Sequence, residues 1–242
     1  MIAGEFLAAA ERLPLVDLDM LTPDGAILVV APHQDDETLG CGGLIAEAVG
    51  RGRRVEILFV SDGGASHPGS RLWPRPRLRN LREAEATTAA AILGLLPQAL
   101  TFLRLPDGGL PSTGPGFDSA VQAIARRARA CGAGTICVTW GCDPHRDHQA
   151  AHAMAAAAAL MLGIRLLSYP VWGHTLPPQT PVADRHPRGG RLDIARHVAR
   201  KARAIAAHRS QLGLVIADDP EGFVLDQDMQ ARFVRPFEIF LQ

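Results

Sequence analysis

The chain has 242 residues, of which 47% are hydrophobic and 21% are charged, and these proportions are ordinary for a globular protein. Its 25 basic and 25 acidic side chains give a formal net charge of zero, so nothing indicates nucleic acid or an anionic membrane as a partner. The four cysteines form no Cys-x-x-Cys pair, and we expect a reducing, cytoplasmic location. The N-terminus does not resemble a signal peptide, and the longest apolar stretch, Ala150–Leu162, is too short to span a bilayer.

Short apolar runs alternate with helical patterns along most of the chain, after a short amphipathic helix expected at Phe6–Leu13. The predicted strands cover Ala26–Ala31, Val55–Val60, Ala99–Leu105, Thr135–Trp140 and Arg165–Val171. The predicted helices between them cover Leu39–Val49, Leu78–Leu95, Phe117–Ala130 and Gln149–Leu162. This alternation predicts an α/β protein with a Rossmann-like, mostly parallel sheet and helices on both faces.

The remainder of the chain is expected to elaborate this core. Residues Trp172–Gly190 are rich in proline and glycine, and we predict a loop that covers the carboxyl edge of the sheet. The elements predicted after it are a strand at Arg191–Ile194, a helix at His197–His208, and a closing helix and strand within Glu221–Gln242. Without an internal repeat, we expect a single domain over residues 1–242, with a core of about 26–171 and a C-terminal elaboration over 172–242.

Three titratable side chains, His33, Asp35 and Asp36, follow the first predicted strand directly. Ligands of open α/β sheets bind at the edge where the carboxyl ends of parallel strands meet. His33 and Asp36 can converge from a tight turn on one metal ion, and an imidazole with a carboxylate suits zinc. Asp35 stays free and is placed to take a proton from a water activated by that ion. Alternatively, the acids only cap the following helix and His33 is an ordinary turn histidine.

A second polar cluster follows the fourth predicted strand and contains His145, Asp147, His148 and, one helical turn later, His152. One of the histidines can complete a set of three protein ligands with an open position, and His152 rivals His148 because His-x-x-x-His is also a metal-ligand spacing. The other histidine, if protonated, could stabilise an oxyanion or protonate a leaving amine. Asp147 could then fix its tautomer and raise its pKa. A helix merely capped by Asp147 is the simpler alternative, but each cluster supports the other.

Both clusters resemble motifs of the LmbE-like, or PIG-L, family of zinc-dependent de-N-acetylases. Ala-Pro-His33-Gln-Asp35-Asp36-Glu37 resembles the family signature Pro-His-Pro-Asp-Asp-Glu, and Pro-His145-Arg-Asp147-His148 resembles its His-Pro-Asp-His motif. The similarity runs from about Ala26 to Gln211 through three further stretches: Arg82-x-x-Glu85, Leu105-Pro106-Asp107-Gly108 and Lys201…His208-x-Ser210-Gln211. Gln34 and Arg146 replace usual prolines, which only stiffen the turns.

The resemblance implies a role for individual residues. It implies that His33, Asp36 and His148 hold one Zn²⁺ per chain, although another divalent metal would also suit. It further implies that Asp35 is the general base, and that His145 stabilises the tetrahedral intermediate and acts as general acid, with Asp147 orienting it. Arg82 and Asp107 match positions that hold polar groups of the substrate.

These observations predict a zinc-dependent hydrolase that removes an acetyl or other acyl group from an N-acetylated amino sugar or its conjugate, and thus acts on a non-peptide C–N bond. Its partner is then a small-molecule amino sugar. One alternative is a non-catalytic metal- or sugar-binding protein of the same fold, which would be expected to lack Asp35 or His145. Another is an amidase that acts on a different small-molecule amide. A nucleotide-binding protein is disfavoured, because the turn after the first strand lacks G-x-G-x-x-G.

Overall fold

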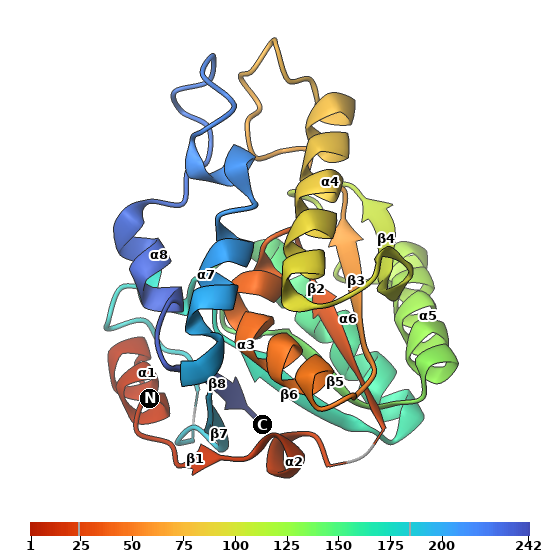
Figure 1. Ribbon diagram of the computed structural model, residues 1–242, viewed down its shortest axis with the longest axis vertical. Coiled ribbons are helices and arrows are strands. Elements are labelled where there is room, and N and C mark those ends of the chain that lie inside the picture. Colours follow the sequence, from red (N-terminus) through yellow and green to blue (C-terminus); the bar gives the residue numbers. More distant parts are fainter. Residues whose placement is uncertain (24, 184) are drawn as a thin grey trace.

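The computed structural model describes residues 1–23, 25–183 and 185–242, so Asp184 of the expected loop at Trp172–Gly190 lies outside the described residues (Figure 1). An eight-stranded sheet in the order β1-β7-β8-β6-β5-β2-β3-β4 forms its centre. The five core strands are all parallel: β2 (Ala26–Ala31), β3 (Val55–Ser61), β4 (Leu100–Leu105), β5 (Ala133–Thr139) and β6 (Arg165–Tyr169). The predicted Rossmann-like fold is therefore confirmed.

The strand order reverses direction between β2 and β5, which are neighbours in the sheet but not in the chain. Connections that leave two such strands run to opposite sides, and this opens a crevice at their carboxyl ends. The first predicted cluster lies in the turn after β2 and at the start of α3, and the second lies between the turn after β5 and the first turns of α6. The fold therefore brings both clusters to the same crevice.

Helices cover both faces of the sheet and build two apolar cores. Alternate residues of β2 point to opposite faces, with Ile27 and Val29 in one core and Leu28 and Val30 in the other. The first core lies under α3 (Asp36–Gly50), α4 (Arg75–Leu93) and α7 (Val198–Ile205). The second lies under α5 (Gly114–Cys131) and α6 (Arg146–Leu162). Every residue of β2 is buried, as its continuous apolar run predicts.

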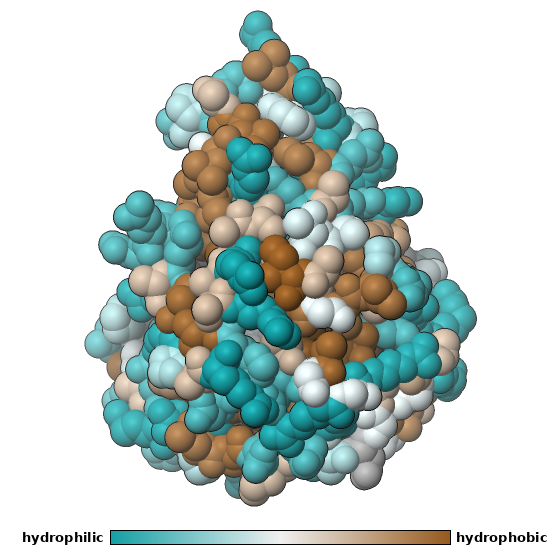
Figure 2. All heavy atoms as spheres, viewed as in Figure 1, coloured by the Kyte–Doolittle hydropathy of each residue, from teal (hydrophilic) through white to brown (hydrophobic). Residues whose placement is uncertain are grey.

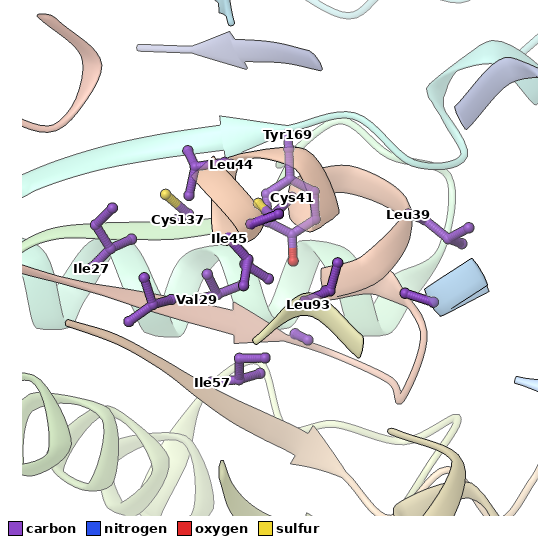
Figure 3. Close-up of a cluster of buried hydrophobic side chains, with 14 of the residues drawn as sticks. Ile27, Val29, Leu39, Cys41, Leu44, Ile45, Ile57, Leu93, Cys137 and Tyr169 are labelled. Atoms are coloured by element: carbon purple, nitrogen blue, oxygen red, sulfur yellow. The ribbon is translucent and has the colours of Figure 1, made fainter. Parts of the chain in front are cut away.

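The first core packs closely where α3 crosses the sheet, beneath the first predicted cluster (Figure 3). Tyr169 is fully buried there, and its hydroxyl donates a hydrogen bond of 3.1 Å to the Val30 carbonyl. A Cβ at Gly40 would lie only 2.0 Å from the Tyr169 ring, so only glycine allows this approach. This packing fixes the start of α3, and hence the turn that precedes it, against the end of β2.

The edge of the sheet beyond β6 was only partly predicted. The C-terminal strand β8 (Phe237–Leu241) is antiparallel and lies between β6 and β7 (Gly189–Asp193). A two-residue strand near the N-terminus, β1 (Leu15–Val16), pairs with β7 and was not predicted. The other helical elements are α1 (Ala3–Ala10), α2 (Leu18–Leu21), α8 (Gln227–Phe233), η1 (Pro97–Ala99), η2 (Gly173–Thr175), η3 (Ala195–His197) and η4 (Arg209–Leu212). Within the described ranges, no helix is long and apolar enough for a bilayer crossing.

The predicted loop at Trp172–Gly190 covers less of the crevice than expected. Trp172 and Thr175 line it, but the following residues run back to the N-terminal helix α1. There the Pro178 carbonyl accepts a hydrogen bond from the Gly4 N–H at 2.9 Å. Residues of the later C-terminal elaboration, Gln211 among them, supply much of the remaining wall.

Candidate functional site

A cavity of about 610 Å³ lies at the crevice between the β2 and β5 turns. Six of the predicted site residues line it: His33, Asp35, Asp36, Arg82, Asp107 and His145. The other two, Asp147 and His148, are buried and are not part of the lining. The remaining lining residues are Ala65, Ser66, Gly108, Pro144, Trp172, Thr175, Gln211, Glu221 and Phe223.

The turn after β2 holds its side chains with an unusual backbone conformation at Asp35, where φ is +155° and ψ is −31°. A non-glycine residue in this region carries strain of about 1–3 kcal/mol, which surrounding contacts must offset. The Glu37 carboxylate accepts a hydrogen bond from the Asp35 N–H at 3.0 Å. Gln34, which stands at a usual proline position of the family, donates from Nε2 to the Ser61 carbonyl at 3.0 Å. These contacts tie the strained turn to the end of β3.

Asp36 lies between the two histidines predicted as metal ligands. Its Oδ2 is 3.2 Å from His33 Nδ1 and 3.3 Å from His148 Nε2. Ligands about 2.0–2.1 Å from a tetrahedral ion lie about 3.4 Å from one another, so these separations suit a shared divalent cation. His148 Nε2 is buried and, among the described residues, has no hydrogen-bond partner. An unpaired, buried imidazole nitrogen beside a carboxylate fits a metal ligand.

The opposite nitrogen of each histidine faces another carboxylate. His33 Nε2 lies 3.1 Å from Asp107 Oδ1 and 3.3 Å from Asp147 Oδ2, while His148 Nδ1 lies 3.0 Å from Asp143 Oδ2. Metal-binding histidines commonly donate their second N–H to such a carboxylate, which fixes the ring and its tautomer. The contacts of both histidines therefore fit those of metal-binding imidazoles.

Two sets of three side chains in the described chain bring possible ligand atoms within 4.8 Å of one another, and Asp36 belongs to neither. The sets are His33, His145 and His148, and His33, Asp107 and Asp147. The Asp107 carboxylate already accepts a hydrogen bond from the Ala65 N–H at 2.8 Å. The Asp147 carboxylate accepts two, from the Gly108 N–H at 2.8 Å and the Leu110 N–H at 3.0 Å. We favour Asp36 because it contacts the unpaired nitrogen of His148 as well as His33.

The rival ligand His152 is turned away from this centre. Its Nδ1 lies 3.0 Å from the Thr139 carbonyl and 3.5 Å from Ser168 Oγ, at the ends of β5 and β6. It lies on the same helix as His148, but it forms no part of the cavity lining.

Arg82 contacts protein groups at the inner end of the cavity. It donates from Nη1 to the Gly63 carbonyl and from Nη2 to the Gln34 carbonyl, each at 3.1 Å. Nη2 also lies 3.4 Å from Asp35 Oδ1, so the guanidinium pairs with the predicted base. Burial nevertheless raises the pKa of Asp35 to about 7, with the Arg82 charge opposing the shift. Arg82 thus stabilises the turn after β2 and contacts the carboxylate of the predicted base, in addition to its predicted contact with the substrate.

Asp147 does not orient His145 in the way the sequence suggested. Its carboxylate contacts His33 and the backbone between β4 and α5, whereas its backbone N–H donates to His145 Nδ1 at 3.2 Å. This leaves the proton of a neutral His145 on Nε2. The pKa of His145 is lowered by burial and by the neighbouring charges of His33 and His148, so the expected rise is wrong. Neutral His145 is therefore a hydrogen-bond donor through Nε2.

Asp143 is a buried residue that sequence patterns did not place in the site. Its Oδ2 accepts from the Val171 N–H at 3.1 Å, in addition to its contact with His148. Asp143 lies five residues before His148, on the other side of a turn, so helical spacing does not predict this contact. Its distance to His148 Nδ1 suits the outer carboxylate of a metal-binding histidine.

Removing the Asp143 carboxylate should weaken metal binding without removing a ligand. We expect Asp143→Ala to lower zinc affinity about 10- to 100-fold, the usual effect of losing an outer carboxylate, because His148 loses its orientation. Competition with a chromogenic chelator measures this affinity, and Asp118→Ala, an exposed aspartate on α5, is the control. Unchanged affinity in a folded Asp143→Ala protein would contradict this role.

The metal-free protein should lose stability as the pH rises from about 7 to about 9. Burial raises the pKa of Asp35 to about 7 and that of Glu37 to about 8. For His148, burial lowers the pKa, but Asp36 and Asp143 together outweigh it and raise the pKa to about 9. The pKa of His33 is also raised despite burial, through its bond to Asp107. In the unfolded chain, carboxyl groups titrate near pH 4 and histidines near 6.5, so above pH 7 the folded state holds more protons and becomes less stable as they leave. Below pH 7, buried histidines whose pKa is lowered, such as His208, act in the opposite direction.

Thermal unfolding of the chelator-treated protein at several pH values tests this slope. Glu37→Gln should make it shallower, because one of the groups with a raised pKa no longer titrates. Metal binding should show the opposite trend and strengthen with pH, since the ion competes with protons for its ligands. A metal-free protein whose stability rises between pH 7 and 9 would contradict the assigned environment of these groups.

The chain is similar to proteins of one family. A family model described as "PIG-L: GlcNAc-PI de-N-acetylase" matches residues 28–159, more than half of the chain. A 2'-N-acetylparomamine deacetylase from Streptomyces fradiae is 30% identical over 157 residues, which cover 55% of this chain and 52% of that protein. The match thus spans about half the length of this curated relative.

Two solved structures share the fold. A conserved protein from Thermus thermophilus superposes with a TM-score of 0.65 at 27% identity, covering 90% of this chain and 94% of the other. An N,N'-diacetylchitobiose deacetylase from Pyrococcus horikoshii gives a TM-score of 0.68 at 19% identity, covering 98% and 90%. At 19% identity, the similarity to the Pyrococcus horikoshii structure shows the fold alone. The family model, the fold and the two motif clusters together place the chain in the PIG-L, or GlcNAc-PI de-N-acetylase, family.

Proposed function

We propose that the chain is a metal-dependent hydrolase that removes an acetyl or other acyl group from an N-acetylated amino sugar or its conjugate. The observation that carries this proposal is Asp36 between the two histidines, with Asp35 in the same cavity but facing Arg82. The family description and the deacetylase from Streptomyces fradiae support amide hydrolysis.

His33, Asp36 and His148 are the residues proposed to hold the metal. Zinc is the ion that suits two imidazoles and one carboxylate best, although other divalent ions bind the same donors. When bound, such an ion polarises an amide carbonyl and makes a nearby water more acidic. The outer contacts of Asp107, Asp143 and Asp147 keep both imidazoles in place.

Asp35 is proposed as the general base. It lines the cavity next to Asp36, and Arg82 holds its carboxylate from the other side. Its strained backbone keeps the side chain out of the position that a regular helical turn would give it. A carboxylate there can accept the proton of the attacking water as the carbon–oxygen bond forms.

His145 is proposed to stabilise the oxyanion of the tetrahedral intermediate. Its Nδ1 accepts the Asp147 N–H, so its Nε2–H is available as a donor to developing negative charge in the cavity. A neutral imidazole serves this purpose, in contrast to the protonated ring that the sequence suggested. Asp107 and Arg82 complete the inner wall, where the acetamido group has to lie.

Acetate release from a panel of N-acetylated amino sugars and their conjugates tests this function. The metal-free protein should release no acetate, and activity should return when zinc or another divalent ion is added back. Binding of an amino sugar without any acetate release by metal-loaded protein would instead favour a non-catalytic binding protein. Turnover of other small amides alone would favour a different amidase.

A further inference from the structure

His208 is a buried histidine of the C-terminal segment that the proposed chemistry does not use. It follows α7, and its backbone N–H donates to the Ile205 carbonyl at 3.1 Å, while its carbonyl accepts the Gln211 N–H at 2.9 Å. Two residues further on, the Glu85 carboxylate of α4 accepts hydrogen bonds from the Ser210 N–H at 2.8 Å and from Ser210 Oγ at 2.6 Å. The segment around His208 is therefore fixed to both α7 and α4.

The His208 ring is neutral and carries its proton on Nε2. Burial, together with the nearby charge of Arg82, lowers the pKa of His208 to about 3. Nε2 lies 3.3 Å from Thr38 Oγ1, whereas Nδ1 is buried and has no hydrogen-bond partner among the described residues. The Thr38 hydroxyl donates its own proton to Glu37 Oε1 at 2.7 Å, so its oxygen is left to accept from the ring. The Nε2–H group of His208 is thus the donor in this contact.

The contact continues through Glu37 to the backbone of the predicted base. Glu37 Oε2 accepts the Asp35 N–H at 3.0 Å, so this acidic side chain in the first turn of α3 reaches back to the N-cap of its own helix. Its other oxygen, Oε1, accepts the Thr38 hydroxyl. We call His208, Thr38 and Glu37 the support network. It joins the C-terminal segment to the strained backbone at Asp35 by an unbroken series of hydrogen bonds.

The support network is closed off from solvent. His208 is 2% exposed, and Glu37 and Thr38 are fully buried. The helices α3 and α7, which carry and precede these residues, contribute to one apolar core, and Figure 2 shows a closed surface of side chains where they lie in Figure 1. A hydrogen bond that is lost in such a region is not replaced by one to water. Each member of the network therefore holds its neighbour.

Asp35 needs this support because its backbone conformation is unfavourable. With φ at +155°, its peptide tends to relax toward a regular turn unless contacts prevent it. The bond to Glu37 is the hydrogen bond that the Asp35 N–H donates within the described part of the chain. The orientation of this peptide sets the direction of the Asp35 carboxylate, whose Oδ1 lies 3.4 Å from Arg82. Loosening the peptide should therefore misdirect the carboxylate.

We propose that His208 is a positioning residue for the general base: through Thr38 and Glu37 it holds the strained Asp35 peptide so that the carboxylate is aimed at the attacking water. This inference rests on the proposed deacetylase function. His208 is not part of the cavity lining, and its ring contacts Thr38 instead of the proposed metal ligands. Its removal should therefore slow the chemical step and leave the binding of metal and substrate as they are.

Two pairs of variants test the proposal by acetate release from an N-acetylated amino sugar, with the zinc-loaded full chain. His208→Phe keeps an aromatic ring but removes the donor, whereas His208→Gln keeps an N–H near the position of Nε2. Thr38→Val removes the hydroxyl, and Thr38→Ser keeps it. We expect His208→Phe and Thr38→Val each to lower kcat roughly three- to tenfold, the effect of one hydrogen bond, with KM and zinc affinity changed less than about twofold. His208→Gln and Thr38→Ser should restore most of the loss.

The exposed His186→Phe is the matched control and should leave kcat unchanged. Wild-type kcat in a folded His208→Phe protein would overturn the proposal. A loss of kcat that His208→Gln does not restore would also overturn it, because packing alone would then explain the loss. If His208→Phe does not fold, the comparison of Thr38→Val with Thr38→Ser decides by the same criterion.

Amide hydrogen exchange, followed by NMR, separates the positioning role from the reaction. The Asp35 N–H should exchange roughly three- to tenfold faster in His208→Phe than in the wild type, because its acceptor Glu37 is held less firmly, and His208→Gln should restore slow exchange. If the wild type releases no acetate, the proposed function fails, yet this change in exchange would still support the positioning of Asp35 by His208. Equal exchange of the Asp35 N–H in the wild type and in His208→Phe would overturn the proposal whether or not acetate is released.

Discussion

Asp35→Asn is expected to keep the fold and the bound metal while kcat/KM for acetate release falls roughly 10²–10⁴-fold, the usual contribution of a general base. The Asp35 carboxylate pairs with Arg82 at 3.4 Å, whereas Asp36 contacts both histidines, so the two adjacent aspartates have different tasks. Asparagine keeps the size of the side chain and its contact with the guanidinium, but it cannot take up the proton of the attacking water. Steady-state kinetics on metal-loaded protein, with zinc measured by elemental analysis, test this prediction.

The matched control is Asp118→Asn, which removes the same charge from an exposed position on α5 and should leave the rate unchanged. Near-wild-type turnover by Asp35→Asn with full metal content would refute the assignment of the base. Loss of zinc in Asp35→Asn would show instead that Asp35 is the ligand and that the roles of the two aspartates are reversed.

The core of the fold was predictable because each of its elements has a local signature. The run Ala26–Ala31 forms a strand with the predicted bounds, and its six buried residues explain why no polar side chain interrupts it. The N-terminal strand Leu15–Val16 has only two residues and depends on pairing with a strand more than 170 residues later. The insertion of β8 between β6 and β7 is likewise a long-range pairing, so neither could be inferred from periodicity.

Some residues of the candidate site could likewise be predicted from local sequence patterns, whereas others depend on contacts between distant parts of the chain. His33 and Asp36 could be selected because they directly follow a strand, and the switch between β2 and β5 brings their turn close to the second cluster. The choice of His148 over His152 in that cluster came from the resemblance to the family motif and not from the spacing. The contacts of Asp143 and Asp147 depend on the path of the chain after the turn, and there the sequence assigned to His145 a carboxylate, that of Asp147, which contacts His33 instead. Gln211 and Phe223 reach the cavity from a C-terminal segment whose position only the folded chain shows.

The acidity of the site also depends on three-dimensional burial. Asp35 and Asp36 are adjacent in the chain and equally buried, yet their pKa values move in opposite directions. Burial raises that of Asp35, whereas at Asp36 the charges and hydrogen bonds of His148 and His33 together outweigh burial and hold the pKa far below the usual range. This contrast suits the two proposed roles, because the ligand Asp36 has to be ionised and the base Asp35 has to exchange a proton near neutral pH.

His148→Ala is expected to abolish stable metal binding, with a loss of affinity that exceeds the 10- to 100-fold effect of removing an outer carboxylate. The residue is fully buried, and its Nε2 has no hydrogen-bond partner among the described residues but lies 3.3 Å from Asp36 Oδ2, so its removal deletes a nitrogen placed to share a cation with Asp36. His152→Ala is the matched control, because it removes an imidazole one turn further along α6 that contacts Thr139 and Ser168 instead. The difference in metal affinity between the two variants is measured by elemental analysis and chelator competition. Both variants are first checked for a cooperative thermal transition. Full occupancy in His148→Ala together with loss of metal in His152→Ala would show that the helix supplies its ligand from the second histidine.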